Sequence, residues 1–283
     1  MKMKALTGLS IAALATGAVS VQAQTIDGTL DGSYGSALSV QTIATDYGSQ
    51  TAATGGNQLD AAYGQISGGN LDLFFAGNTS DGNSLHIYLA DGQAGQSTFN
   101  VSGGSYSSTA TTTLDGSVFS PDFSATHMID VNTYSGTIYA NIFNLVLGTG
   151  GYAGSTADAG GTITGGPYNI TVAVNNSSPA GAGSNTGAGA LAVTTGWELQ
   201  ISLSALNNAS SIQVLADIGS DGGGSGSLAN QFLAPANVSG YPQTFNFGST
   251  PGQYFVVSAP EPTTLALAGL GGLATLVAAR RRK

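Results

Sequence analysis

Short runs of alternating apolar and polar residues recur through the middle of the chain, separated by clusters of Gly, Asn, Asp and Ser. A period of two predicts β-strands with one buried face, and such clusters predict turns. We expect strands at 39–45, 58–67, 70–77, 84–90, 128–131, 136–147, 168–175, 196–203, 211–218 and 253–257. One helical turn is expected at 204–208, and no long amphipathic helix. The pattern predicts an all-β fold with a single, jelly-roll-like β-sandwich.

The two clearest runs lie at 70–77 and 84–90. In both, the apolar side chains share one face: Leu71, Leu73, Phe75, Leu85, Ile87 and Leu89. His86 and Tyr88 then point outward from the second run. Because a turn-rich link containing Asp81-Gly82 joins the runs, we expect a hairpin here. The glycine-rich stretches 148–166 and 175–189 are expected to be surface loops.

The first residues have the pattern of an export signal. Lys2 and Lys4 precede an apolar stretch from Leu6 to Val21, and Val21-Gln22-Ala23 fits the rule for signal cleavage. We predict a signal helix over 1–23, cleavage after Ala23 and a mature N-terminus at Gln24. The alternative is an N-terminal anchor that is not cleaved.

The other end combines three features. The triplet Pro260, Glu261 and Pro262 precedes an uncharged stretch at 263–279, and a basic cluster ends the chain: Arg280, Arg281, Arg282 and Lys283. As a helix the stretch would span roughly 25 Å, the short end of a bilayer crossing. The cations should stay in the cytoplasm, which places the body outside the inner membrane.

This order of triplet, short transmembrane helix and basic end resembles the PEP-CTERM sorting tail of Gram-negative bacteria. The resemblance implies three segments: a signal peptide at 1–23, an extracellular body at 24–258 and a sorting tail at 259–283. It also implies an exosortase as processing partner, transient anchoring in the inner membrane, and final location at the cell surface or outside the cell. The alternative is a plain C-terminal anchor that is never cut.

Charge separates the ends from the body. All six Lys and Arg residues lie in the two terminal segments, so the stretch from Gln24 to Ser258 contains none. Of the fifteen acidic residues only Glu261 lies in the tail, which leaves fourteen in the body and a charge of about −14. Nucleic-acid binding needs cations and is therefore excluded for the body, and anionic lipids and phosphorylated ligands are disfavoured for the same reason. The chain also lacks cysteine, which excludes disulfides and thiol chemistry.

The start of the body carries a second resemblance. Ile26-Asp27-Gly28, followed by Asp31 and Tyr34, resembles the opening of carbohydrate-binding modules of the family-nine and DOMON-like type. The segments at 70–77, 84–91 and 197–206 resemble the core strands of that group. The resemblance implies a β-sandwich and an extracellular polysaccharide partner.

Few residues offer catalytic chemistry. The two histidines, His86 and His127, are expected to be unrelated and partly exposed. Trp197, the only tryptophan, is expected in the core, with Glu198 on the surface because alternation puts the two on opposite faces. Glycoside hydrolysis needs two carboxylates at a fixed separation, and no spacing identifies a second. We therefore predict no catalytic residue.

No cofactor or metal site is predicted. Calcium is the one ion left open, at Asp217 with Asp221 or at Asp27 with Asp31, although the EF-hand spacing is missing. The tyrosines are expected to be buried or half-buried structural residues. The body is thus expected to be a non-catalytic structural or adhesive domain that could bind glycan. The alternative is a secreted carbohydrate-active enzyme that uses carboxylates.

Overall fold

The computed structural model describes residues 24–260, with gaps at 47–56, 80, 103–112, 158, 177–186 and 221–226. The strands are β1 (Ser39–Val40), β2 (Gln58–Ser67), β3 (Asn70–Asn78), β4 (Asn83–Ala90), β5 (His127–Tyr134), β6 (Thr137–Asn144), β7 (Thr149–Ala157), β8 (Ala159–Gly165), β9 (Ile170–Asn175), β10 (Gly196–Ser202), β11 (Ser211–Ser220), β12 (Leu228–Leu233) and β13 (Phe255–Ser258). The 3-10 turns are η1 (Gly32–Tyr34), η3 (Ala190–Ala192) and η4 (Leu203–Leu206).

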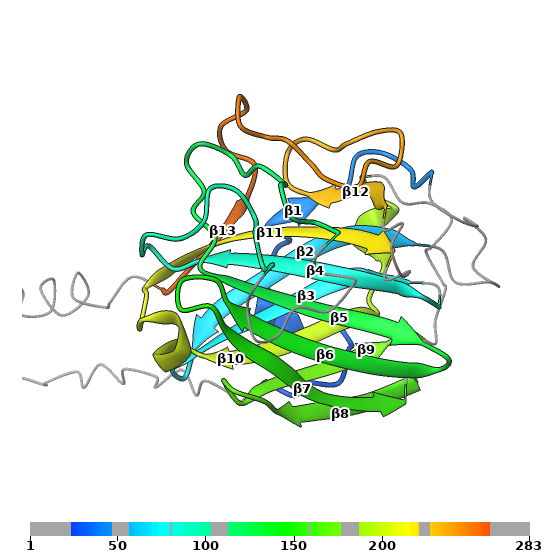
Figure 1. Cartoon of the computed structure of the whole chain (residues 1–283). Helices are drawn as coiled ribbons and strands as arrows, with labels where there is room; N and C mark the ends of the chain where they lie inside the picture. Colours follow the sequence, from blue (N-terminus) through cyan, green and yellow to red (C-terminus); the bar gives the residue numbers. More distant parts are fainter. Residues whose placement is uncertain are drawn as a thin grey trace, which may run out of the picture.

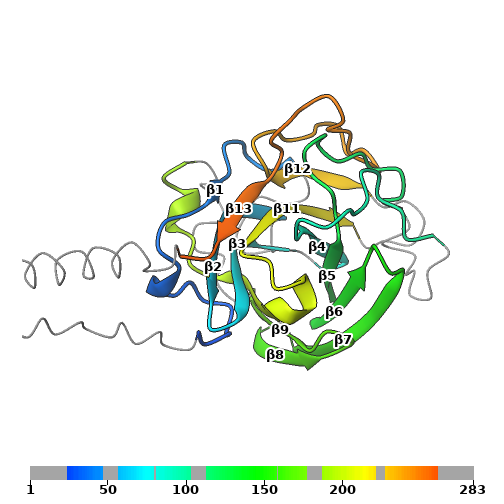
Figure 2. The ribbon, with the colours of Figure 1, turned by 90° about the vertical axis from the view of Figure 1, so that its left-hand side faces the viewer.

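The strands form two packed antiparallel sheets, which confirms the predicted β-sandwich. One sheet has the order β1-β2-β3-β10-β9-β8, and the other has the order β12-β11-β4-β5-β6-β7, with β13 added beside β11. Strands β4 to β7 run side by side across the second sheet (Figure 1). At one side of the sandwich β7 lies next to β8, so the chain passes there from one sheet to the other (Figure 2).

The main core lies between the sheets and contains the apolar side chains expected to point inward. It includes Leu71, Leu73, Phe75, Leu85, Ile87, Leu89 and Trp197, all fully buried. The predicted helical turn after β10 is present as η4. Alternation in the sequence therefore assigned the correct faces to β3, β4 and β10, because one face of each contacts the opposite sheet.

Three predictions about strands were wrong. The runs at 70–77 and 84–90 do not form a hairpin, since β3 pairs with β2 and β10, whereas β4 pairs with β11 and β5 in the other sheet. The link between them passes between sheets, and the Gly82 N–H donates to the carbonyl of Thr133. The expected loop at 148–166 forms β7 and β8, and the strand expected at 39–45 is reduced to β1. Strand β12 was not predicted.

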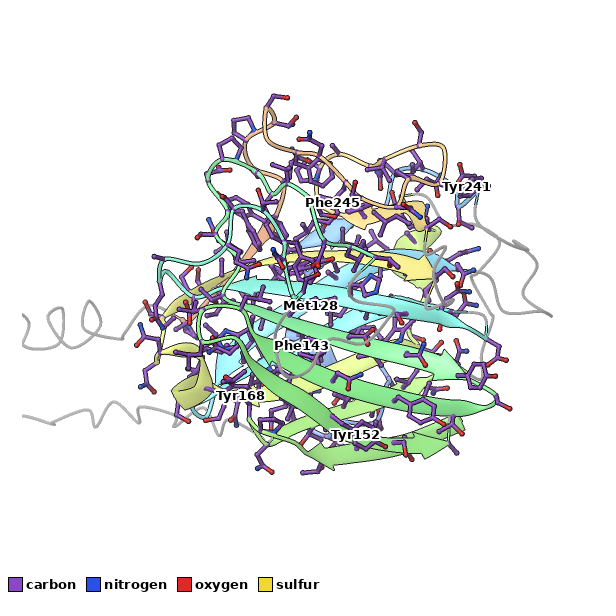
Figure 3. The ribbon with its side chains drawn as sticks, viewed as in Figure 1. Met128, Phe143, Tyr152, Tyr168, Tyr241 and Phe245 are labelled. Carbon is purple, nitrogen blue, oxygen red and sulfur yellow. The ribbon has the colours of Figure 1, made fainter. Side chains whose placement is uncertain are left out.

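Both sheets are also covered on their outer faces. Loops at 91–102, 113–126 and 234–254 pack an aromatic cluster onto the second sheet, and Phe245, Met128 and Phe143 belong to it (Figure 3). On the first sheet, the N-terminal segment packs Tyr34 against Phe74 and Tyr63. The β-sandwich thus has a central core and two smaller outer ones.

The two predicted terminal helices, at 1–23 and 263–279, lie outside the described residues. Within the described part of the chain, none of the helical turns has the length and apolar character needed to cross a bilayer. The last strand of the described residues, β13, ends at Ser258.

Candidate functional site

Glu198 accepts four hydrogen bonds from the N-terminal segment. It lies on the outer face of β10 and its side chain is fully buried. Its Oε2 accepts from the backbone N–H groups of Asp27 at 2.8 Å and Gly28 at 3.0 Å. Its Oε1 accepts from the Tyr34 hydroxyl at 3.0 Å and from the Gln24 side-chain amide at 3.1 Å. This carboxylate anchors the N-terminal segment to the first sheet.

The prediction that Glu198 lies on the surface was wrong. Alternation placed it correctly on the outer face, but residues 24–34 return over that face and exclude water. Burial raises the pKa of Glu198, while the hydrogen bonds from Asp27, Gly28 and Tyr34 act in the opposite direction. The neighbouring Trp197 is in the core, as predicted.

Asp27 and Asp31, one of the two acidic pairs proposed for calcium, form hydrogen bonds within the same N-terminal segment. The Asp27 side chain accepts from the backbone N–H of Thr29 at 2.9 Å, which closes a local turn. Asp31 accepts from the side-chain amide of Gln24, whose oxygen in turn accepts from Gln65 at 3.2 Å. Gln24, the predicted mature N-terminal residue, is therefore held by side chains of this network.

A second polar group lies on the outer face of the other sheet. The register places Asp217 of β11, His86 of β4, Asp130 of β5 and Asn141 of β6 in one row. His86 Nδ1 is 2.7 Å from Asp217 Oδ1, and His86 Nε2 is 3.9 Å from Asp130 Oδ1. The Asn141 amide donates to Asp130 at 3.3 Å.

This row is buried, which contradicts the expectation of a partly exposed His86. His86 is 1% exposed, Asp217 0% and Asp130 2%. Burial raises the pKa of Asp130, and the neighbouring His86 opposes that shift. Tyr88, also fully buried, has a pKa raised by burial and then by Asp217. The row links four strands by charge and hydrogen bonds, and the Asp217 carboxylate proposed for calcium is engaged by His86.

His127 is buried as well, and the expectation of partial exposure was wrong here too. Its Nε2 accepts from the Asn144 side-chain amide at 2.9 Å, and its Nδ1 lies 3.2 Å from the hydroxyl of Thr126. Burial lowers the pKa of His127. The expectation that the two histidines are unrelated fits their separate hydrogen-bond partners.

Asp60 differs from the other buried carboxylates. It lies at a β-bulge, where the register of β2 against β3 shifts between Leu59 and Ala61. It is 0% exposed, and neither carboxylate oxygen has a hydrogen-bond partner among the described residues. Burial raises its pKa to about 7. Sequence alternation cannot identify such a group, because the bulge interrupts the period of two.

Most tyrosines of the described residues are buried or half-buried, but a few are not. Tyr34, Tyr63 and Tyr88 are in the cores, as the sequence led us to expect. Tyr134 is 59% exposed and Tyr152 is 56% exposed. These two lie on β5 and β7 in the outer face of the second sheet, beyond the part that the aromatic loops cover.

In the described part of the chain, no group of three or more His, Asp or Glu side chains is arranged to hold a metal ion. The second residue of the other proposed calcium pair, Asp221, lies outside the described residues.

Comparison with known proteins gives one match, at the end of the chain. Residues 258–283 match the PEP-CTERM protein-sorting motif. No curated protein and no solved structure matches the chain, so the resemblance of the body to carbohydrate-binding modules stays a prediction. The match contains the Pro-Glu-Pro triplet, the apolar stretch and the basic end. The chain therefore carries a PEP-CTERM sorting motif, which implies an exosortase as processing partner, export, and anchoring in the membrane during sorting.

Proposed function

We propose that the body is a non-catalytic structural or adhesive component of the cell surface or extracellular matrix. The observation that carries the proposal is the sorting tail at 258–283, joined to one β-sandwich with a central core and a smaller core on part of each outer face. The tail delivers the body to the surface, and the three hydrophobic cores make it a rigid module. Its charge of about −14 and lack of cations disfavour anionic partners.

The carboxylates support a structural role for these side chains. Glu198 binds four donors of the N-terminal segment, Asp217 contacts His86, and Asp72 accepts from Gln200 at 2.8 Å. Each of these acids is at most 2% exposed. A glycosidase of the usual kind needs two carboxylates on either side of a bound sugar. Side chains this deeply buried could reach a polysaccharide only if the covering segments moved away.

The alternative is a secreted carbohydrate-active enzyme, and the row of Asp217, His86 and Asp130 is its best candidate centre. Its test is incubation of the exported protein with neutral polysaccharides, followed by measurement of released reducing sugar. Sugar release that the His86→Gln variant abolishes, without loss of folding, would overturn the non-catalytic proposal.

The sorting step predicts a change of location when the tail is altered. Deletion of Arg280–Lys283, or the Glu261→Gln change, is expected to leave most of the protein in the inner-membrane fraction or mislocalised. The reason is that the basic end fixes the orientation and the triplet belongs to the recognised motif. Cell fractionation with immunoblotting measures this. The matched control is Val256→Ala, exposed on β13 just before the tail. An unchanged distribution of the tail variants would contradict the sorting role.

The adhesive role predicts how the surface protein is released. Because the body has no Lys or Arg, its attachment cannot depend on ion pairs with anionic groups of the matrix. High salt is therefore expected to leave the processed protein on the cells, whereas enzymatic digestion of the extracellular polysaccharide should release most of it. Release by salt alone, or retention after complete digestion, would contradict this role.

A further inference from the structure

The outer face of β5, β6 and β7 carries three tyrosines in a diagonal line. Tyr134 of β5 is in register with Thr137 of β6, Tyr139 of β6 with Ser155 of β7, and Asn141 of β6 with Tyr152 of β7. Each step along the line moves one strand across and about two residues along the sheet. Tyr152 lies on the outward side of β7 (Figure 3).

The spacing of this tyrosine row follows from sheet geometry. Diagonal neighbours on one face of an antiparallel sheet lie about 7–8 Å apart, so the three rings cover about 15 Å. That length accommodates several successive sugar rings of an extended chain. Tyr134 and Tyr152, the two ends of the row, are more than half exposed, and Tyr139 between them is partly exposed. Packing of the protein does not account for these exposed rings.

The strands hold the row in place. Tyr134 precedes the two-residue turn Ser135-Gly136, in which both residues have positive φ, as tight β-hairpins require. The Ser135 N–H donates to the side chain of Asp81, which ties this turn to the link between β3 and β4. On β7, Tyr152 is the one large side chain among Gly, Ala, Ser and Thr, so nothing bulky on its own strand flanks the ring.

Polar groups suited to hydroxyls lie beside the rings. Asn141, the cross-strand partner of Tyr152, is partly exposed, and its amide nitrogen is oriented by Asp130 at 3.3 Å. Thr137 and Ser155, the partners of Tyr134 and Tyr139, add hydroxyl groups. Alternating aromatic faces and hydrogen-bonding groups match the apolar faces and hydroxyl edges of pyranose rings.

The net charge of the body limits which polymers can bind to the tyrosine row. The body has no Lys or Arg, so an anionic polymer would meet only repulsion, and a second copy with the same charge of about −14 would be repelled too. Charge thus excludes anionic polymers, and the exposed tyrosine faces favour an uncharged polysaccharide at the surface to which the sorting tail delivers the body.

We propose that Tyr134, Tyr139 and Tyr152 form the site at which the body binds an extended, uncharged polysaccharide. This inference rests on the proposed adhesive function and specifies its site and ligand class. The sugar rings stack on the tyrosines in sequence, and the amide of Asn141 and the flanking hydroxyls bond the sugar hydroxyls.

The test compares the exported protein with its triple variant Tyr134→Ser/Tyr139→Ser/Tyr152→Ser. Sedimentation with cellulose, curdlan or chitin, and with dextran sulfate as the anionic probe, measures binding. The natural protein is expected to bind at least one neutral polymer and not dextran sulfate, and the triple variant about tenfold more weakly or worse. Tyr241→Ser is the matched control, because Tyr241 is 45% exposed but lies in the loops outside the row. It should bind normally.

The outcomes separate this site from the proposed function. Equal binding by the natural protein and a folded triple variant, with circular dichroism as the check, overturns the site while leaving the adhesive function intact. Binding only to dextran sulfate overturns the ligand class. Absence of binding to all three neutral polymers, while the protein stays attached to polysaccharide on cells, overturns the neutral-chain site alone. If the protein binds none of the neutral polymers and is also not attached to polysaccharide on cells, the adhesive function is overturned as well.

Discussion

The Asp60→Asn variant is expected to be more stable than the natural protein at pH 8, by about 4 kcal/mol. Asp60 is fully buried at the bulge of β2, and its oxygens have no hydrogen-bond partner among the described residues. The body also has no Lys or Arg that could compensate a charge there. An ionised carboxylate at this position is therefore costly, and a neutral amide of the same shape removes the cost.

The pH dependence has a definite sign. The pKa of Asp60 is raised from 3.8 to about 7 in the folded state, a difference of about three units, and each unit corresponds to about 1.4 kcal/mol. The contribution is fully present below the unfolded pKa, near 4, and is lost as the pH rises through about 7. The gain of Asp60→Asn is thus expected at pH 8 and should nearly vanish at pH 3, below the unfolded pKa. Urea unfolding at both pH values measures it.

A matched control should show the opposite sign. The pKa of Asp122 is lowered by the hydrogen bonds from Ser120 and the Gly252 N–H. Its contribution is present above the unfolded pKa and is lost as the pH falls through the lower folded value. Asp122→Asn should therefore destabilise the protein at pH 8 and have little effect in strong acid. A destabilising Asp60→Asn at pH 8, or one that is independent of pH, would contradict the assignment of a buried, uncompensated carboxylate.

Residue alternation predicts some strands of this fold and misses others, for physical reasons that differ from strand to strand. Strands β3, β4 and β10 were predicted because large apolar residues alternate with polar ones along each. Strands β7 and β8 were missed because they consist mainly of Gly, Ala, Ser and Thr, which favour loops in isolation. Small residues are needed there, since a Cβ on Gly154 would lie 2.7 Å from a methyl carbon of Ile163. These segments form strands because β7 and β8 pack against each other, and the local residue pattern does not contain that contact.

The same limit applies to the sites. The sorting tail was recognised from the sequence because all its features are contiguous, from the triplet at Pro260 to the basic end at Lys283. The faces of His86 and Glu198 were also assigned correctly, but their exposure was not. Whether an outer face is covered depends on segments far away in the sequence: residues 24–34 over Glu198 and the loops after β4 and β12 over the second sheet. Periodicity gives the direction of a side chain and not what lies above it.

The Glu198→Ala variant is expected to lose about 4 kcal/mol of stability, because a buried donor deprived of its acceptor costs about 1–3 kcal/mol and several are affected. The N–H groups of Asp27 and Gly28 and the hydroxyl of Tyr34 all lose their acceptor. Urea unfolding of the exported protein measures the loss. Because these donors belong to the N-terminal segment, that segment should separate from the first sheet before the rest unfolds.

Graded variants test whether Glu198 acts through these hydrogen bonds. Tyr34→Phe removes one donor without leaving another unpaired, and should cost only about 1 kcal/mol. Glu198→Gln keeps one acceptor oxygen and should fall between the two. Hydrogen exchange gives a local measure: in Glu198→Ala the amides of Asp27 and Gly28 should lose protection, while those of His86 and its neighbours on β4 keep theirs. If the two N-terminal amides remain protected, Glu198 does not hold this segment, and a loss of stability would have to come from the cavity alone.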